Sequence, residues 1–355
     1  MLSNILPTIA LAGAAMAACP LTVDIVSTDA HVATVAVTNI GSDAITVFKG
    51  NTVLSEHATM DLLVSDAAGN ALPFEGVFVN YKKTNVPATA FQTIQPGETV
   101  TAEVNAAKTY KLAGVASAQI SALQGFRYVV GETIPTALKG LEGCEAESET
   151  VAIVPDQSKI AEEYVSKRGE ANFGRISKRA VTYSGCTTAQ TTSLTTSFAD
   201  AVSMSSAAYT AAATYADNFS LWFRTATTSQ ATKVRTIYND VAGVQTTSPK
   251  VYCNDQYSYC TDGTALLYTV PSANSIVPCP SNGFWDFPQL SPTCSNDDYD
   301  MAGSILHEST HLYGTGDYAY GYVAAQKLSA AQAAANADTY EMYGESVRLG
   351  GCTVG

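Results

Sequence analysis

The sequence predicts two folded parts of different class, an all-β sandwich over residues 19–150 and a mainly α, α+β domain over residues 180–355. Short stretches in which apolar and polar residues alternate, separated by turn residues, fill the first part. After Arg179 the apolar residues recur at helical spacing instead. A chain of 355 residues is long enough for two domains that each bury a core of their own.

Composition narrows the class of protein further. Hydrophobic residues make up 46% of the chain and charged residues 14%, which predicts a folded protein rather than a disordered one. The net charge of −13 argues against nucleic acid as a partner, because few basic side chains are available to neutralise phosphates. An acidic surface would instead favour basic peptides weakly. We expect no membrane partner, because no later segment reaches about 20 uninterrupted apolar residues.

Residues 1–18 have the features of a secretory signal peptide. The apolar run is short, and Ala15 and Ala17 offer a small-residue cleavage site, although no Lys or Arg precedes the run. An N-terminal anchor is the alternative. The eight cysteines, an even number, also fit a secreted, extracellular protein with four disulfides. Cys19 and Cys144 bracket the β-rich part and are expected to pair, whereas the spacing alone leaves the other pairings open.

The first part, residues 19–150, is predicted to be built from strands. Turn residues near positions 41–43, 68–70 and 95–98 separate the apolar stretches. The expected strands cover residues 21–26, 32–37, 61–65, 99–104 and 127–130.

Residues 151–179 are predicted to be a linker, because they are charged and lack strand alternation. They contain two dibasic pairs, Lys167-Arg168 and Lys178-Arg179. In a secretory chain such pairs are sites for processing proteases. Lys178-Arg179 lies where the composition changes, so we expect a processing protease to cut after Arg179.

The second part, residues 180–355, is predicted to contain long helices and two short strands. The helices are expected over residues 190–216, 222–241 and 329–349, with a further buried helix from residue 300. The strands are expected at 251–253 and 265–270.

One motif carries chemistry, the sequence His307-Glu308-Ser309-Thr310-His311 on the helix from residue 300. Two histidines four residues apart lie on one helix face, where both imidazoles can reach one Zn²⁺, and the Glu between them is placed to act on a metal-bound water. Histidine is scarce in this chain, and the other two, His31 and His57, lie far away in the sequence. The motif therefore predicts a zinc hydrolase, and a hairpin formed by the two strands expected at 251–253 and 265–270 is the expected place for an edge strand that pairs with substrate backbone.

A catalytic zinc needs a third protein ligand, and no histidine remains downstream. The nearby carboxylates are Asp317, Asp338, Glu341 and Glu345. Asp317 lies in Gly314-Thr315-Gly316-Asp317-Tyr318-Ala319-Tyr320-Gly321, whose glycines let the chain fold back toward the metal. Its distance from His311 also matches the ligand spacing of metzincins, with Asp in place of the third His.

This combination of motifs resembles the deuterolysin family, the aspzincins, which are secreted fungal metalloendopeptidases of zincin-like fold. The resemblance rests on the histidine motif, on G-T-x-D-x-x-Y-G at 314–321 and on Asn336-Ala337-Asp338-Thr339-Tyr340. Six cysteines after the dibasic site and a β-rich segment before it extend the likeness to the whole chain. In one respect the sequence departs from it, because many members have a longer insert before the G-T-x-D.

The resemblance implies a preproprotein with a signal peptide, a propeptide over residues 19–150, the linker 151–179 and a catalytic domain holding one Zn²⁺. His307, His311 and Asp317 would bind the metal, Glu308 would be the general base for a zinc-activated water, and Tyr320 would steady the oxyanion. The family pattern pairs Cys186 with Cys253, Cys260 with Cys279 and Cys294 with Cys352. The substrates would be proteins or peptides, and the propeptide would keep the site closed until it is cut off.

Asp338 and Glu341 allow two interpretations. They lie three residues apart on a predicted helix and could form a substrate-specificity pocket, as carboxylates at matching positions do in relatives that cut before Lys. Alternatively they form an exposed acidic face, or Asp338 bonds a ligand histidine. For the whole chain, the alternatives are a metzincin-like endopeptidase outside the deuterolysins and a non-catalytic binding protein with a degenerate zincin domain.

Overall fold

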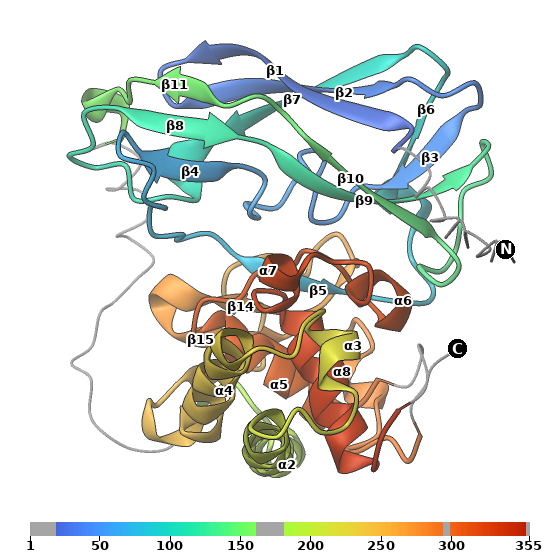
Figure 1. Ribbon diagram of the computed structural model, residues 1–355, viewed down its shortest axis with the longest axis vertical. Helices are drawn as coiled ribbons and strands as arrows, with labels where there is room; N and C mark the ends of the chain where they lie inside the picture. The colour runs from blue at the N-terminus through green and yellow to red at the C-terminus, as the bar shows by residue number, and fades with distance from the viewer. Residues whose placement is uncertain (1–18, 161–180, 294–298, 353–355) are drawn as a thin grey trace, which may run out of the picture.

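The computed structural model describes residues 19–160, 181–293 and 299–352. Figure 1 shows a β-rich N-terminal part (residues 19–160) lying over a C-terminal part (the described residues from 181 onward) that combines helices with a sheet. This two-part layout agrees with the predicted fold class of a β-rich part followed by a part that contains helices. Residues 1–18 and the pair Lys178-Arg179 lie outside the described ranges.

The described N-terminal part contains three antiparallel sheets, with strand orders β1-β2-β7, β10-β9-β3-β6 and β11-β8-β4. The strands of the first sheet are β1 (Leu21–Asp29), β2 (Val32–Asn39) and β7 (Thr99–Asn105). Those of the second are β3 (Ile45–Phe48), β6 (Phe91–Ile94), β9 (Leu123–Val130) and β10 (Glu142–Glu147), and those of the third are β4 (Leu63–Asp66), β8 (Ala118–Ser121) and β11 (Val151–Ile153).

Alternation of side chains builds the core of this part. Ala33, Val35 and Val37 are buried on one face of β2, as period-two patterning requires, and they join a single apolar cluster with residues from the other sheets. Strand β11 belongs to the sheet through its pairing with β8, although the sequence predicts a linker there. A strand of three residues is too short for an alternating pattern to be recognised in the sequence. Its strand conformation depends instead on its pairing with β8.

The helices of the C-terminal part pack around a second core. Their bounds are α2 (Thr188–Ala212), α3 (Phe219–Trp222), α4 (Thr228–Ala242), α5 (Met301–His311), α6 (Tyr322–Ala325), α7 (Ala330–Ala333) and α8 (Ala337–Arg348). Helix α2 begins with a capping box, in which Thr187 and Gln190 each bond the other's backbone N–H.

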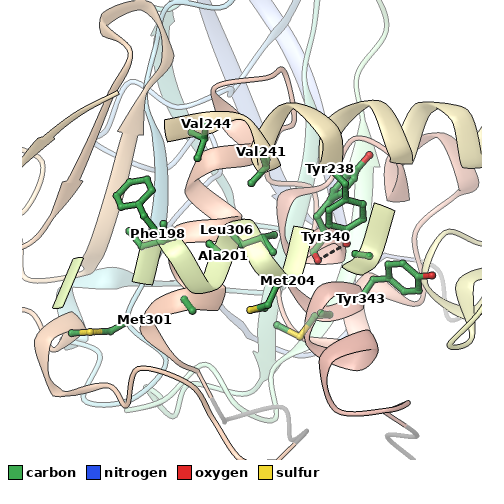
Figure 2. Close-up of a cluster of buried hydrophobic side chains, with 14 of the residues drawn as sticks. Phe198, Ala201, Met204, Tyr238, Val241, Val244, Met301, Leu306, Tyr340 and Tyr343 are labelled. Atoms are coloured by element: carbon green, nitrogen blue, oxygen red, sulfur yellow. Dashed lines mark hydrogen bonds between the residues drawn. The ribbon is translucent and has the colours of Figure 1, made fainter. Parts of the chain in front are cut away.

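Figure 2 shows the core between these helices, where Met204 of α2, Leu306 of α5 and Tyr343 of α8 meet. The hydroxyl of Tyr238 donates to the Tyr340 carbonyl at 2.7 Å and ties α4 to α8. The core therefore fixes α5 and α8 against each other, and these two helices carry most of the predicted site residues.

A mixed five-stranded sheet completes the C-terminal part, with strand order β12-β13-β15-β14-β5. Its strands are β12 (Thr182–Ser184), β13 (Lys250–Tyr252), β14 (Ala265–Val270), β15 (Ser275–Pro278) and β5 (Phe78–Tyr81). Strand β5 comes from the N-terminal part and pairs antiparallel with β14, beside which it lies in Figure 1. The C-terminal part is thus a mixed α/β structure rather than mainly α, and the sequence does not predict that an N-terminal strand joins its sheet.

Two predicted helices are interrupted. The helix expected over 222–241 is α3 followed by α4, because Thr227 caps a new helix by accepting from the Gln230 N–H. The helix expected over 329–349 is α7 followed by α8, separated at Asn336. Asn336 has an extended backbone at the N-cap of α8. Its side chain accepts hydrogen bonds from the N–H groups of Tyr318 and Ala319, which hold this non-helical residue in place.

Three disulfides join described cysteines, Cys19–Cys144, Cys186–Cys253 and Cys260–Cys279. These are three of the four expected pairs. Cys352 is also disulfide-bonded, whereas Cys294, its expected partner, lies outside the described residues. Within the described ranges, no helix combines the length and the apolar character needed to cross a membrane.

Candidate active site

Helix α5 presents the histidine motif toward the sheet and the loop that follows it. The helix begins at Met301 because Asp300 caps it, accepting from the Gly303 N–H at 2.6 Å. Gly303 lets α8 come close, since a Cβ there would lie 3.0 Å from Glu341 Oε1. His307, Glu308 and His311 are at most 1% exposed. The motif is therefore held rigidly inside the molecule.

The loop after α5 turns back sharply and brings Asp317 to the two histidines. Gly314 takes a φ of 98°, which favours glycine, and starts the turn. Gly316 then forms backbone hydrogen bonds with Ala335 at 2.7 Å and Ala337 at 2.9 Å. Together with the Asn336 side chain, these bonds fasten the loop to the start of α8. The short spacing from His311 to Asp317 is thus compatible with a folded-back carboxylate.

Three donor atoms converge at this point. Asp317 Oδ1 lies 3.2 Å from His307 Nε2 and 3.4 Å from His311 Nε2, and the three groups form a cluster that could hold a metal ion. All three atoms are buried without a hydrogen-bond partner, which is costly unless something else satisfies them. Burial raises the pKa of Asp317, but the two imidazoles outweigh it and hold that pKa well below its ordinary value. Two imidazoles and one carboxylate are the donor set of a catalytic zinc site, so these residues fit the metal.

Glu308 lies beside the cluster with one oxygen bound and one free. Its Oε2 accepts a hydrogen bond from the Thr269 hydroxyl of β14 at 2.6 Å, while Oε1 is buried without a partner 3.9 Å from His307 Nε2. Burial raises the pKa of Glu308, against the opposing effect of the two histidines. The oxygen without a partner therefore lies close to one of the three donor atoms.

The other nitrogens of the two histidines face groups that can orient them. His311 Nδ1 lies 3.1 Å from the Thr315 carbonyl oxygen. His307 Nδ1 lies 3.4 Å from Asp338 Oδ1 and 3.2 Å from Glu341 Oε2, and both carboxylates are almost fully buried. Because both carboxylates are buried, they do not form an exposed acidic face. The position of Asp338 behind His307 fits the interpretation in which Asp338 bonds a ligand histidine.

Tyr320 lies next to His307, with the two rings stacked at a centroid distance of 6.0 Å. Its hydroxyl donates to the carbonyl oxygen of Val79 in β5 at 3.0 Å, and Asn51 Nδ2 contacts the same hydroxyl. Burial raises the pKa of Tyr320 well above its ordinary value, so it remains a phenol that can donate. The predicted oxyanion donor therefore bonds a peptide carbonyl in this structure.

The remaining predicted residues lie elsewhere. Glu345, a candidate third ligand, does not belong to the ligand clusters among the described residues and pairs with Arg348. Cys294, Lys178 and Arg179 lie outside the described residues. Sequence reasoning missed the roles of Thr269, Thr315 and Asn336. Thr269 and Asn336 act through hydrogen bonds to distant segments, whereas Thr315 lies only four residues from His311. All three belong to segments that the sequence singles out, Thr269 to the expected hairpin and the other two to the quoted family motifs.

Comparison with known proteins finds proteases that this chain resembles. Residues 208–345 match the family model described as lysine-specific metallo-endopeptidase. The chain is 30% identical over 328 residues to a neutral protease 2 homolog of Sclerotinia sclerotiorum, covering 88% of this chain and 86% of that protein. A homolog of Botryotinia fuckeliana is 29% identical over 344 residues, covering 93% and 92%. Among solved structures, a zinc peptidase from Grifola frondosa aligns with 45% of this chain and 97% of its own at 24% identity and a TM-score of 0.39.

Proposed function

The chain belongs to the deuterolysin (aspzincin) family of zinc metalloendopeptidases, and from this premise we propose that it hydrolyses peptide bonds at the centre formed by His307, His311 and Asp317. One observation carries the proposal. Three buried donor atoms without partners converge beside a buried carboxylate that keeps one oxygen free. Burying polar atoms without partners costs free energy of folding, unless a bound metal and a substrate interact with them.

The two imidazole Nε2 atoms and Asp317 Oδ1 would hold one Zn²⁺ in the catalytic domain. When bound, the ion would supply Lewis-acid chemistry, polarising the scissile carbonyl and acidifying a water. The protein's contribution is to fix the donors. Thr315 holds His311 from behind, and Asp338 and Glu341 hold His307.

Glu308 would act as the general base. Its Oε1 is free to accept a proton from the attacking water and to pass it to the leaving amine. The hydrogen bond from Thr269 fixes the carboxylate by its other oxygen. Burial supports this role because it raises the pKa of Glu308 and so makes its carboxylate a stronger base toward the proton of the attacking water.

Tyr320 would donate to the oxyanion that develops on the scissile carbonyl. Its O–H already donates to a peptide carbonyl, that of Val79, at 3.0 Å, and a donor preset at that position stabilises developing negative charge. The edge of β14 would bind the substrate backbone as an added strand.

We propose that Asp338 and Glu341 position His307 rather than select a Lys side chain at P1′. Both contact His307 and both are buried, so neither presents a carboxylate to solvent in this form. Cleavage of peptides that differ only in Lys, Leu or Gly at P1′ tests this. A strong preference for Lys that is lost on replacing Glu341 would restore the specificity interpretation.

Maturation would follow the order of the chain. Residues 1–18 would direct secretion, a processing protease would cut after Arg179, and the β-rich segment, as a sandwich-type propeptide, would leave an extracellular catalytic domain of residues 180–355. Sequencing the N-terminus of the secreted protein tests the cleavage site, for which Ala180 is the expected first residue.

The decisive experiment is metal-dependent proteolysis by the chain cut after Arg179. We expect one zinc per chain, cleavage of casein, loss of cleavage on removing the metal with a chelator, and recovery on adding zinc. A zinc-loaded, folded protein that leaves casein intact would overturn the proposal and favour the non-catalytic binding protein. Family membership already sets aside a metzincin-like enzyme outside the deuterolysins.

A further inference from the structure

The edge of β14 is occupied by a strand from the same chain. Strand β5 runs antiparallel to β14, with Phe78 opposite Thr269, Val79 opposite Tyr268 and Asn80 opposite Leu267. Thr269 is the residue that bonds the base Glu308. The N-terminal part thus places a strand directly beside the catalytic carboxylate, where a substrate strand would have to lie.

One face of β5 points at the metal centre. The Phe78 ring stacks on the His311 imidazole, with centroids 4.2 Å apart and planes 9° from parallel. Asn80 lies on the same face of the strand, because side chains alternate, and it is 1% exposed with neither side-chain atom hydrogen-bonded. These two side chains fill the space over the motif helix that substrate side chains would otherwise enter.

The opposite face of β5 is anchored by apolar contacts. Val79 and Tyr81 belong to a buried cluster that also contains Ala265, Tyr268 and Val277 of the C-terminal sheet. Apolar area buried in this way stabilises the added strand well beyond its backbone pairing. Strand β5 is therefore a packed element of the sheet and not a loose contact.

The N-terminal part also surrounds Tyr320. The Val79 carbonyl accepts from its hydroxyl and Asn51 contacts the same oxygen. Two buried cations of the N-terminal part, Lys83 and Arg127, lie over the Tyr320 ring at 4.5 Å and 4.7 Å from its centroid. The proposed oxyanion donor is thus fully engaged before any substrate arrives.

We propose that β5 is a built-in substrate mimic that keeps the uncut chain latent by competing with substrates for the edge of β14 and for Tyr320. The inference rests on the proposed peptidase function. It assigns the contact at the edge of β14 to Phe78–Tyr81, and the contact to the Tyr320 hydroxyl to the Val79 carbonyl and Asn51, rather than to the N-terminal part as a whole. Competition of this kind raises the apparent KM of the uncut chain and leaves its kcat close to that of the cut enzyme, because substrate at high concentration displaces the strand.

The test uses the full chain, zinc-loaded, with Lys178→Ala and Arg179→Ala so that it stays uncut, as verified by its mass. Phe78→Ser in that background removes the ring from His311, and we expect the apparent KM for a fluorogenic peptide to fall about tenfold or more, the scale of one lost buried aromatic contact. The control is Ile120→Ser, which alters a buried residue of the N-terminal core that is absent from the cluster around β5. Its apparent KM should stay high.

If Phe78→Ser does not fold, Asn51→Gly tests the same point. It removes the contact to Tyr320 and keeps the positive φ of 54° at that position. An uncut chain with the same KM as the cut enzyme, or equal activation by Ile120→Ser and Phe78→Ser, would overturn the inference. So would a change in kcat with no change in KM. Absence of zinc-dependent cleavage by the cut enzyme is a different result and would contradict the proposed function instead.

Discussion

The ring of Phe78 lies parallel to the imidazole of His311, with 4.2 Å between the two centroids. Phe78 belongs to the β-rich N-terminal part and His311 to the helix that carries the histidine motif, more than 200 residues later in the chain. The contact therefore places the N-terminal part directly against one of the predicted metal ligands. Predictions about the metal centre can be tested on the chain cut after Arg179, whereas predictions about the N-terminal part that lies over it need the uncut chain.

Replacing Glu308 by Gln should separate metal binding from catalysis. The amide keeps an oxygen that can accept from Thr269, but it cannot take a proton from water. We expect the cut enzyme to retain one zinc and to lose activity on casein by about 10²- to 10⁴-fold, the usual contribution of a general base. Zinc content by atomic emission and cleavage rate are measured on the same sample. Cleavage near the wild-type rate would contradict the role of Glu308.

Replacing Asp317 by Ala should remove a metal ligand. Its Oδ1 lies within 3.4 Å of both histidine Nε2 atoms, so its loss leaves two protein ligands and an incomplete site. We expect the purified variant to contain little zinc and to have no measurable activity. Glu345→Gln is the control, because Glu345 is another nearby carboxylate that the sequence offers as a ligand but it pairs with Arg348. Loss of zinc in Glu345→Gln with a normal thermal unfolding curve would contradict the assignment.

Asp338→Asn should weaken zinc binding without removing a ligand. Asp338 faces His307 Nδ1 with one oxygen and accepts from the Gly321 N–H with the other. The amide oxygen of Asn can still accept from the Gly321 N–H. The substitution removes the negative charge beside His307 Nδ1, which would otherwise make the imidazole a stronger ligand. We expect about 10- to 100-fold lower zinc affinity, measured by competition with a chelator. Unchanged affinity together with an altered choice of P1′ residue would support a specificity pocket.

The sequence predicts the chemistry of this site better than its surroundings. The spacing of His307 and His311 is local, so one helical turn brings them together, and the glycines around Asp317 indicate a turn. The separation of α7 from α8 at Asn336 depends on hydrogen bonds to a loop 17 and 18 residues away, which no local pattern reveals. The position of β5 is also beyond local patterning, because its partner β14 lies about 190 residues downstream in the sequence and pairing at that distance is decided by packing.

The stability of the N-terminal part should fall as the pH rises from 4 to 7.5 because of Asp61. Burial raises the pKa of this carboxyl to about 7, against a hydrogen bond from Thr59 that lowers it. The folded state therefore keeps this proton up to about pH 7, whereas the unfolded chain loses it near pH 3.8. The contribution to stability is complete below pH 3.8, declines as the pH rises and is lost as the pH passes 7. The effect amounts to at most about 4 kcal/mol.

Urea unfolding of the uncut chain at several pH values measures this slope. In Asp61→Asn the side chain carries no charge at any of these pH values, so most of the decline should disappear. Asp66→Asn is the control, since Asp66 is a turn residue of the same part whose pKa is lowered by Asn70. An Asp61→Asn variant that loses as much stability between pH 4 and 7.5 as the parent chain would contradict the prediction.

Gly125→Ala should loosen the N-terminal part from the catalytic part. Gly125 of β9 packs against the loop that carries Asp317, and a Cβ there would lie 2.8 Å from the Tyr318 carbonyl oxygen. A backbone atom cannot rotate away, so one surface must move. Alanine is otherwise acceptable in a strand, and the strand itself should not be weakened.

Gly143→Ala on the neighbouring β10 is the matched control, because the nearest atom to its Cβ would be 3.9 Å away. After cleavage at Arg179 the two parts are separated and rejoined, and their Kd is measured by calorimetry. We expect Gly125→Ala to raise Kd about tenfold or more, as overpacking of this size typically costs 1–3 kcal/mol. Equal Kd values for the two variants would show that the loop carrying Asp317 is not held by this close contact.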